Sequence, residues 1–378
     1  MEPFVYSLRR RLAKTVTAAT AVLSALLATP VSAQDLRAQP VASGLEHPWA
    51  VAFLPEGRFL VTERPGRMRV VEPDGTVGAP LAGLPAVAAR GQGGLLDVVL
   101  DSDFARNRSL YFCFSEPGAG GNSTALARAR LAADRSRLEA VQVIFSQKPK
   151  VASSAHFGCR IVETPAGALF LTLGDRFSRM QDAQTLDNHH GKVVRLNKDG
   201  SAAAGNPFAG QAGALPEIWS YGHRNVQGAA LAPDGVLWLH EHGPQGGDEI
   251  NLPQPGRNYG WPVITYGENY GGGKMGEGIT ARAGMEQPLH YWVPSIAPSG
   301  MAFLTSERYG AAMKGNLFIG SLKFNYLARL ELADGKVLRE HKLLAGSGRI
   351  RDVRQGPDGL LYLLTDSSNG RLLRLLPP

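Results

Sequence analysis

The chain has 378 residues, of which 44% are hydrophobic and 19% are charged. This composition provides enough apolar surface for a large buried core and excludes an intrinsically disordered protein. The formal net charge is +7, and the 45 glycines and 25 prolines favour an all-β fold rich in turns over a helical one.

The first 33 residues are typical of an export signal. Four cations form its basic N-terminal region: Arg9, Arg10, Arg11 and Lys14. The apolar stretch that follows, TVTAATAVLSALLATP, is too short to span a bilayer comfortably, and small residues at 31–33 provide a cleavage site before Gln34. We therefore expect residues 34–378 to form the mature protein, located in the periplasm or secreted.

The predicted signal carries four positive charges and one negative charge, so its removal lowers the formal net charge from +7 to +4. The mature sequence has no run of lysines and arginines and no second long apolar stretch. These features argue against nucleic-acid binding and against membrane insertion. A small anionic ligand, held by a few specific cations, remains compatible with the sequence.

A unit of two apolar strands joined by a Pro/Asp/Gly-rich turn occurs six times. The copies begin at His47, Gly93, His156, Arg224, Pro298 and Arg349. Their spacing of 46 to 74 residues is too long for a β-helix, and the strands lack the periodicity of helical repeats. Because a lone hairpin cannot bury both faces, we expect a single six-bladed β-propeller with four-stranded antiparallel blades. A β-sandwich with long loops is the alternative.

Two cysteines, Cys113 and Cys159, each lie in a strand-like apolar run. In an exported protein they could form a disulfide, but the sequence alone does not decide the pairing. We favour two buried free thiols at this stage. The spacing of cysteines and histidines does not suggest a zinc site.

The stretch HFGCRIVETPAGALFLTLGDR is predicted to form two strands around a Pro-Ala-Gly turn. His156 opens the first strand and Asp175 closes the second, so the two side chains can meet across the hairpin. A carboxylate beside a histidine orients the imidazole ring and favours its protonated form, which suits a general base. A purely structural histidine is the alternative.

The first strand of each propeller blade lines the central channel, so the polar residues at the repeat starts should converge at one mouth. The candidates are Gln92, His156, Arg224, Asn225, Arg349 and Arg351. Arg349 and Arg351 alternate along RIRD and point to the same side of their strand. Single arginines usually form surface ion pairs, but this set predicts a pocket for a ligand with several carboxylates or phosphates.

The segment at 241–262, EHGPQGGDEINLPQPGRNYGWP, combines Gly/Pro backbone with Asp248 and Glu249. Free carbonyls and carboxylates suit a hard cation such as calcium, although the EF-hand spacing is absent. His240 and His242 would share one face of a strand, but no third zinc ligand is apparent nearby. The chain lacks G-x-S-x-G, which argues against an ordinary serine hydrolase.

Six stretches together resemble the soluble glucose/sorbosone dehydrogenase family, whose members depend on pyrroloquinoline quinone (PQQ). They are GQGGLLDVVLDSDF, HFGCRIV with LTLGD, YGHRNVQG, EHGPQGGDEINL with GRNYGWP, GSLK and RIRDV. They occur in the order of the family, and the resemblance as a whole runs from about His47 to Asp366, which makes it specific. It implies a six-bladed propeller with PQQ over one channel mouth, where the active site lies.

The resemblance implies that His156 takes the proton of the sugar's anomeric hydroxyl while the anomeric hydride passes to the quinone. Asp175 would orient His156, and Arg224 would stabilise negative charge at the reacting quinone carbonyl. The oxygens of the cofactor would be held by Gln92, Arg224, Asn225, His242, Lys323, Arg349 and Arg351.

Two calcium positions are also implied. The carbonyls of Gly243 and Pro244 would bind the calcium that polarises PQQ, and Glu249 and Tyr259 match a structural calcium position. His242 replaces a glutamine of the glucose-specific branch, and the loops are shorter, so the sequence resembles the broad-specificity aldose sugar dehydrogenase branch. Aldoses would be oxidised to lactones, with electrons passed to an external acceptor, by a monomer or a homodimer.

Two other functions remain open at this stage. A calcium-dependent propeller hydrolase, such as a lactonase, would use a channel metal and a histidine. A non-catalytic propeller would only bind a sugar. Neither function requires a binding site for a ligand with several negative charges. The cations Lys323, Arg349 and Arg351 therefore favour the dehydrogenase.

Overall fold

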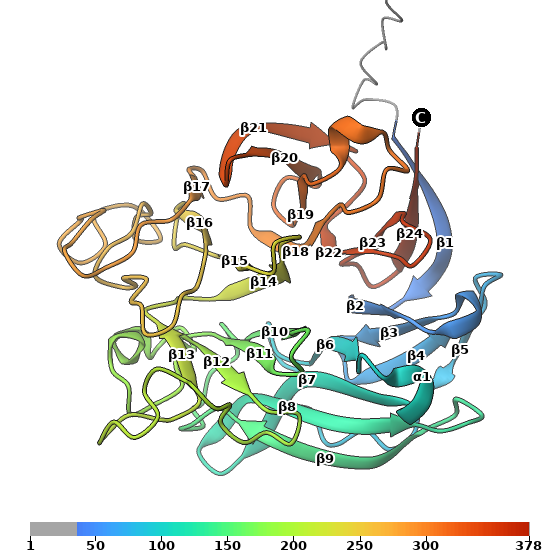
Figure 1. Ribbon diagram of the computed structural model, residues 1–378, viewed down its shortest axis with the longest axis horizontal. Coiled ribbons are helices and arrows are strands. Elements are labelled where there is room, and N and C mark those ends of the chain that lie inside the picture. Colours follow the sequence, from blue (N-terminus) through green and yellow to red (C-terminus); the bar gives the residue numbers. More distant parts are fainter. Residues whose placement is uncertain (1–35, 378) are drawn as a thin grey trace, which may run out of the picture. The chain divides into compact units, whose positions relative to one another are not determined.

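The computed structural model describes residues 36–377, in which 24 strands form six four-stranded antiparallel sheets. The sheets surround a central axis as the blades of a propeller (Figure 1). The expected six-bladed fold is therefore confirmed. The predicted export signal lies outside the described residues and stays a prediction. No helix within 36–377 is long and apolar enough to cross a membrane.

Blades 1 to 5 each consist of four consecutive strands. Blade 1 contains β2 (Pro48–Phe53), β3 (Phe59–Glu63), β4 (Arg67–Val71) and β5 (Val77–Pro80). Blade 2 contains β6 (Leu95–Leu100), β7 (Ser109–Gly118), β8 (Gly121–Leu131) and β9 (Leu138–Ser146). Blade 3 contains β10 (Gly158–Glu163), β11 (Leu169–Leu173), β12 (Lys192–Leu196) and β13 (Ile218–Tyr221). Blade 4 contains β14 (Val226–Leu231), β15 (Leu237–Glu241), β16 (Asp248–Asn251) and β17 (His290–Trp292). Blade 5 contains β18 (Pro298–Phe303), β19 (Leu317–Ser321), β20 (Leu327–Ala333) and β21 (Lys336–Leu343).

Blade 6 is built from both ends of the described chain. Its strands are β22 (Ile350–Gln355), β23 (Leu361–Thr365), β24 (Gly370–Leu376) and β1 (Arg37–Leu45). The outermost strand, β1, pairs antiparallel with β24, so backbone hydrogen bonds close the ring of blades (Figure 1). The sequence pattern did not predict β1. Short helices lie in the connections: η1 (Pro55–Gly57), α1 (Phe104–Asn107), η2 (Met180–Gln184) and η3 (Ala311–Met313).

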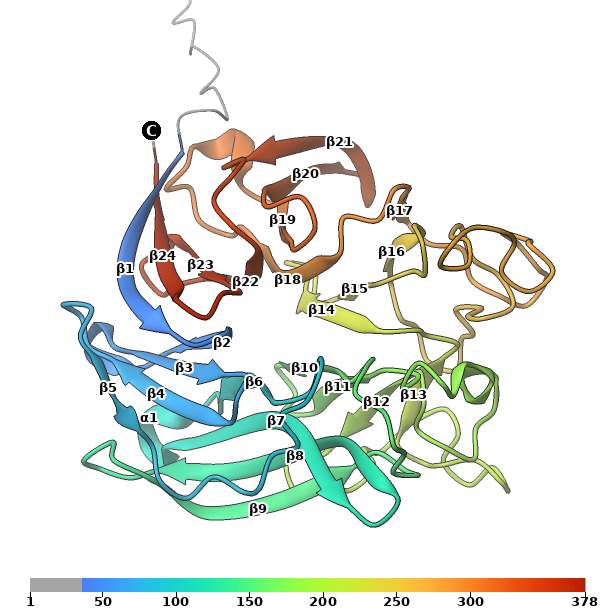
Figure 2. The same ribbon diagram turned by 180° about the vertical axis from the view of Figure 1, so that it is seen from behind.

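The first strand of every blade is the innermost one, as both views show (Figures 1 and 2). Each inner strand contacts the inner strands of the two neighbouring blades: β2, β6, β10, β14, β18 and β22. Apolar side chains fill the space between blades, in clusters that join blades 1 to 3, blades 3 and 4, blades 4 and 5, and blades 5, 6 and 1. This packing fixes the starts of the inner strands around one channel mouth, where the candidate site lies.

Cys113 of β7 and Cys159 of β10 form a disulfide with a Cα–Cα distance of 5.8 Å. Both cysteines are fully buried. The expectation of two free thiols was wrong, because the packing of blade 2 against blade 3 brings the two strands within bridging distance. The bond connects the blade that carries His156 to its neighbour.

Candidate active site

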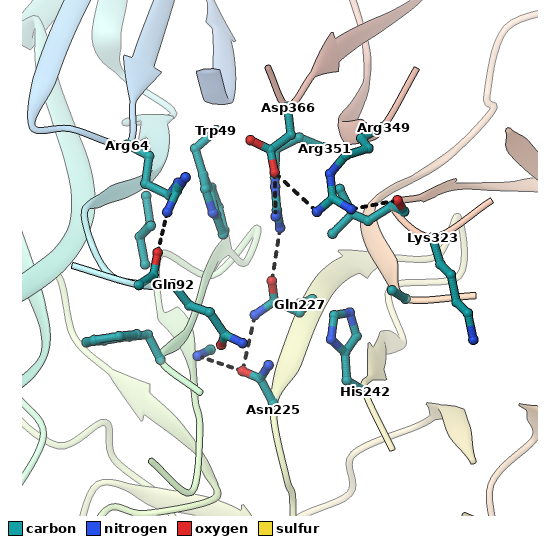
Figure 3. Close-up of a pocket in the computed structure, with 16 residues that line it drawn as sticks. Trp49, Arg64, Gln92, Asn225, Gln227, His242, Lys323, Arg349, Arg351 and Asp366 are labelled. Atoms are coloured by element: carbon teal, nitrogen blue, oxygen red, sulfur yellow. Dashed lines mark hydrogen bonds and ion pairs between the residues drawn. The ribbon is translucent and has the colours of Figure 1, made fainter. Parts of the chain in front are cut away.

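A cavity of about 510 Å³ lies where the inner strands begin (Figure 3). Six of the predicted cofactor-binding residues line it: Gln92, Asn225, His242, Lys323, Arg349 and Arg351. The seventh, Arg224, lies beside it and donates a hydrogen bond of 3.1 Å to the backbone carbonyl of His242. The structure thus brings together predicted residues from four of the six repeats, as the propeller geometry predicted.

Cations outnumber anions in the lining of this cavity. Four cations line it, Arg64, Lys323, Arg349 and Arg351, and one carboxylate, Asp366. The Asp366 Oδ2 lies 3.3 Å from Arg351 and 3.5 Å from Arg349. Burial acts against its charge, but the neighbouring Arg351 holds the pKa of Asp366 at about 2. One ionised carboxylate therefore leaves an excess of positive charge for an anionic ligand.

Asp366 was not among the predicted site residues. It lies just after the end of the second strand of blade 6, as Asp175 and Glu241 lie at or just after the ends of the second strands of blades 3 and 4. The acidic residue at the end of repeat sequences such as LYLLTD and VLWLHE is therefore the signal that would have revealed it.

Arg351 is the most deeply placed cation of the cavity. Its Nη1 donates a hydrogen bond of 3.2 Å to the amide oxygen of Gln227, a lining residue that the sequence analysis missed. Burial lowers the pKa of Arg351 to about 10, so it stays protonated at neutral pH. Its Nε is buried and has no hydrogen-bond partner in the part of the chain that the structure describes. This N–H is available to donate a hydrogen bond to an anionic ligand.

His156 and Asp175 meet as predicted. The imidazole Nδ1 lies 2.7 Å from Asp175 Oδ1, and both side chains are buried. Burial lowers the pKa of His156 and outweighs the opposing effect of Asp175. Burial also acts to raise the pKa of Asp175, but its bond to His156 keeps that pKa below the ordinary value.

These pKa shifts correct one expectation. The carboxylate was expected to favour the imidazolium, whereas burial favours the neutral ring. A neutral His156 with Nδ1–H donated to Asp175 leaves Nε2 free to accept a proton. This arrangement has the chemistry that a general base at neutral pH requires.

The backbone around the pair adopts conformations that side-chain-bearing residues rarely accept. His156, Arg176 and Phe177 have φ values of 51°, 59° and 63°. Between them, Gly174 approaches so closely that a Cβ would lie 2.1 Å from the carbonyl oxygen of His156. The Phe177 ring stands edge-on to the His156 ring at 5.2 Å and is 51% exposed. Strained backbone of this kind concentrates at functional sites.

Arg224 and Trp261 complete the surroundings of the pair. Trp261 Nε1 donates a hydrogen bond of 2.7 Å to Asp175 Oδ2, and the Arg224 guanidinium lies 5.1 Å from the Trp261 ring. Burial is the main cause of the lowered pKa of His156, and the positive charge of Arg224 lowers that pKa further. Trp261 was missed because it lies 86 residues from Asp175 in sequence, in a loop without a strand pattern.

The predicted metal-binding residues are only partly assembled. Gly243, Glu249 and Tyr259 line one narrow cavity of about 10 Å³, whereas Pro244 does not. The Gly243 carbonyl accepts a hydrogen bond of 2.7 Å from Arg224, a partner that was not predicted. Among residues 36–377, no group of three or more His, Cys, Asp or Glu side chains is placed to hold a metal ion.

Glu249 faces a second carboxylate across its sheet. It stands directly opposite Glu241 in the register of β16 and β15. Burial and the charge of Glu241 raise the pKa of Glu249 above its ordinary value. The Tyr259 hydroxyl is occupied, because it donates to the Leu252 carbonyl and accepts from the Gln254 amide. Its backbone carbonyl is the group left for a cation.

His240 and His242 do not form a zinc pair in the structure. His240 is fully buried and neither ring nitrogen has a partner among residues 36–377. His242 Nε2 donates to the Pro298 carbonyl at 2.6 Å, and burial lowers its pKa to about 3. His242 therefore contributes a neutral imidazole ring of fixed orientation to the lining of the cavity of about 510 Å³.

A buried ion network next to the cavity was not predicted. Arg160 Nη1 lies 2.9 Å from Asp352 Oδ1 and 3.4 Å from Asp97 Oδ1. Arg354 contacts the same two carboxylates, at 2.6 Å for Asp97 and 3.1 Å for Asp352. These residues belong to the inner strands of blades 2, 3 and 6. The network therefore links the inner strands of three blades through buried ion pairs.

The fold and the site define a six-bladed propeller whose channel mouth holds a cationic cavity beside a buried His–Asp pair. A family model described as Glucose / Sorbosone dehydrogenase matches residues 45–374, and the chain belongs to that family. The Aldose sugar dehydrogenase YliI of Escherichia coli is 46% identical over 359 residues, which cover 94% of this chain and 95% of that protein. The resemblance inferred from the six sequence stretches is confirmed.

Two solved structures extend this similarity. The soluble aldose sugar dehydrogenase of Escherichia coli in the apo-form has a TM-score of 0.88 and 45% identity, covering 91% of this chain and 100% of that chain. The PQQ-bound form of the aldose sugar dehydrogenase from Streptomyces coelicolor has a TM-score of 0.75 and 29% identity, covering 90% and 97%. Both share the propeller fold with the present chain.

Proposed function

We propose that the protein is a PQQ-dependent aldose dehydrogenase that oxidises the anomeric carbon of a sugar to a lactone and passes the electrons to an external acceptor. The observation that carries the proposal is the cationic cavity beside the neutral His156–Asp175 pair. A lactonase or a passive sugar-binding protein has no need of this cation set. The similarity to a PQQ-bound aldose sugar dehydrogenase supports the same function.

The cavity fits PQQ by its chemistry. PQQ is a planar quinone with three carboxyl groups, and the four cations and one carboxylate of the lining leave three positive charges. The unpartnered Nε of Arg351 offers a buried donor for a carboxylate or quinone oxygen. The residues that would hold the cofactor are Gln92, Arg224, Asn225, His242, Lys323, Arg349 and Arg351.

When bound, PQQ would supply an electrophilic quinone carbonyl as the acceptor for the anomeric hydride. His156 Nε2 takes the proton of the anomeric hydroxyl, so that the C–O bond gains double-bond character as the hydride leaves. Asp175 keeps the proton of His156 on Nδ1 and so keeps Nε2 basic. Arg224, beside the pair, stabilises the negative charge that develops during the transfer.

Replacing Arg351 with alanine tests the anion-binding role. We expect the dissociation constant of PQQ to rise about 10- to 100-fold, because a charge-assisted hydrogen bond contributes about 1.5–3 kcal/mol. The measurement is a calorimetric titration of the cofactor-free protein with PQQ. Arg308→Ala, which removes an exposed cation away from the cavity, is the matched control and should bind as wild type does. Equal affinities of Arg351→Ala and wild type would refute the assignment.

Calcium belongs to the same proposal. Glu249 and Tyr259 line a cavity of about 10 Å³, which is room for one small ion or water. Like charges directly opposite across a sheet are destabilising, and a cation between Glu249 and Glu241 would offset that repulsion. The second position, at Gly243 and Pro244, requires Arg224 to share the Gly243 carbonyl with the ion. Its chemistry would be to polarise the quinone.

Glu249→Gln tests the first calcium position. The raised pKa of Glu249 means that metal-free wild type loses stability as the pH rises from the ordinary carboxyl pKa through the raised one. Calcium should restore the lost stability, so it should raise the melting temperature of wild type most at neutral and alkaline pH. The variant should lack both the pH-dependent loss and the calcium response. An equal calcium response in the variant would place the ion elsewhere.

A further inference from the structure

Both carboxylate oxygens of Asp175 are occupied by protein donors. Oδ1 accepts from His156 Nδ1 at 2.7 Å and from the Phe177 amide at 2.8 Å. Oδ2 has one hydrogen-bond partner within residues 36–377, the indole Nε1 of Trp261 at 2.7 Å. The Asp175 side chain is only 1% exposed, so bulk water does not replace a lost donor. The orientation of this carboxylate therefore depends on Trp261.

The loop that carries Trp261 is held rigidly. The Trp261 amide donates to the Gly222 carbonyl at 2.9 Å, and its own carbonyl accepts from the Gln184 side chain at 2.6 Å. The preceding Gly260 has a φ of 87°, and a Cβ there would lie 2.2 Å from the Ile264 side chain. The indole is therefore fixed before any ligand binds, as a positioning group must be.

Trp261 contacts a second residue of the reaction. The Arg224 guanidinium lies 5.1 Å from the indole ring, within the range of a cation–π interaction. The N–H edge of one indole thus meets Asp175 while its ring lies near Arg224. No other aromatic side chain in the described part of the chain contacts both residues in this way.

We propose that Trp261 is a positioning residue for the oxidation, whose indole N–H locks the Asp175 carboxylate so that His156 presents Nε2 to the sugar. This rests on the proposed function, in which His156 is the base. Without the N–H, Oδ1 keeps its two donors but Oδ2 loses its own. The carboxylate is then less constrained, and more of its negative charge lies on the oxygen that faces His156. The imidazolium is then stabilised, and the fraction of neutral base at a given pH falls.

Trp261→Phe removes the N–H and keeps an aromatic ring. We expect kcat to fall about 10-fold with KM within about twofold of wild type, as for the loss of one hydrogen bond to a charged group. The pKa of His156 should rise, which moves the acid limb of the kcat profile to higher pH. Trp219→Phe is the matched control, since Trp219 Nε1 donates to the Pro253 carbonyl and not to the pair.

The experiment has a readout that needs neither PQQ nor turnover. The pKa of His156 is measured by NMR of imidazole-labelled, cofactor-free protein, with the resonance assigned by its absence in His156→Ala. A higher His156 pKa in Trp261→Phe than in wild type and Trp219→Phe supports the proposal. An unchanged pKa together with an unchanged kcat overturns it.

A double-mutant cycle identifies the route of the effect. In an Asp175→Asn background, Trp261→Phe should cause little further loss of kcat, because the indole acts through the carboxylate. A full tenfold loss in that background overturns the proposed route. If the His156 pKa shifts as expected while no variant oxidises sugars, the positioning role stands and the proposed function fails.

Discussion

Replacing His156 with alanine is expected to slow sugar oxidation by about 100- to 10,000-fold, as for the loss of a general base. PQQ affinity should stay near that of wild type, because His156 does not line the cationic cavity. Two measurements separate these effects. Rapid-mixing absorbance of PQQ-loaded protein with excess aldose follows the reductive step alone, and a PQQ titration reports binding.

The control for this substitution is another His–carboxylate pair. His341 lies 3.2 Å from Glu331 on the outer strands of blade 5, and His341→Ala should reduce PQQ at the wild-type rate. Asp175→Asn should be slower than wild type but faster than His156→Ala, because the base remains but is poorly oriented. Reduction at the wild-type rate in His156→Ala would mean that the base lies elsewhere.

Replacing Asp352 with alanine is expected to lower the free energy of unfolding by about 3–5 kcal/mol, as for breaking a buried ion pair. The substitution leaves Arg160 and Arg354 with one carboxylate, Asp97, between them. Asp352 is fully buried and also accepts the Val51 amide of blade 1 at 3.2 Å. Chemical denaturation of wild type and variant measures the difference.

Asp103→Ala is the matched control for this network. Asp103 pairs with Arg106 at 2.6 Å, but both side chains are more than half exposed. Such a surface pair contributes about 0–1 kcal/mol, so the control should unfold close to wild type. If Asp352→Ala and Asp103→Ala unfold at the same denaturant concentration, the buried network does not stabilise the channel.

The sequence was informative about the fold because each blade repeats one hairpin pattern with strong apolar alternation. It failed for β1, whose residues RAQPVASGL are mostly exposed and contain a proline. That strand lies at the outer edge of blade 6, where it contacts β24 and β5 of blade 1, and it lacks the apolar alternation of a core strand. Its place is decided by pairing with β24, a contact between the two ends of the described chain.

The site was predictable where equivalent repeat positions carry unusual residues. His156 and Arg224 lie two residues before β10 and β14, and Arg351 is the second residue of β22. The symmetry of the propeller was therefore enough to bring them to one mouth. Trp261 reaches the same place from a loop, which no periodicity describes. Asp97 and Arg160 were missed for another reason: in a strand sequence, a buried ion network cannot be told apart from solvent-facing charges.

The most direct test of the proposed function uses the wild-type protein, free of cofactor and then loaded with one equivalent of PQQ and calcium. Rapid mixing with excess aldose should convert the absorbance of the bound quinone to that of its reduced form, with one lactone produced for each PQQ. The cofactor-free protein should produce none. PQQ that binds tightly but stays oxidised in the presence of every aldose tested would contradict the proposed function.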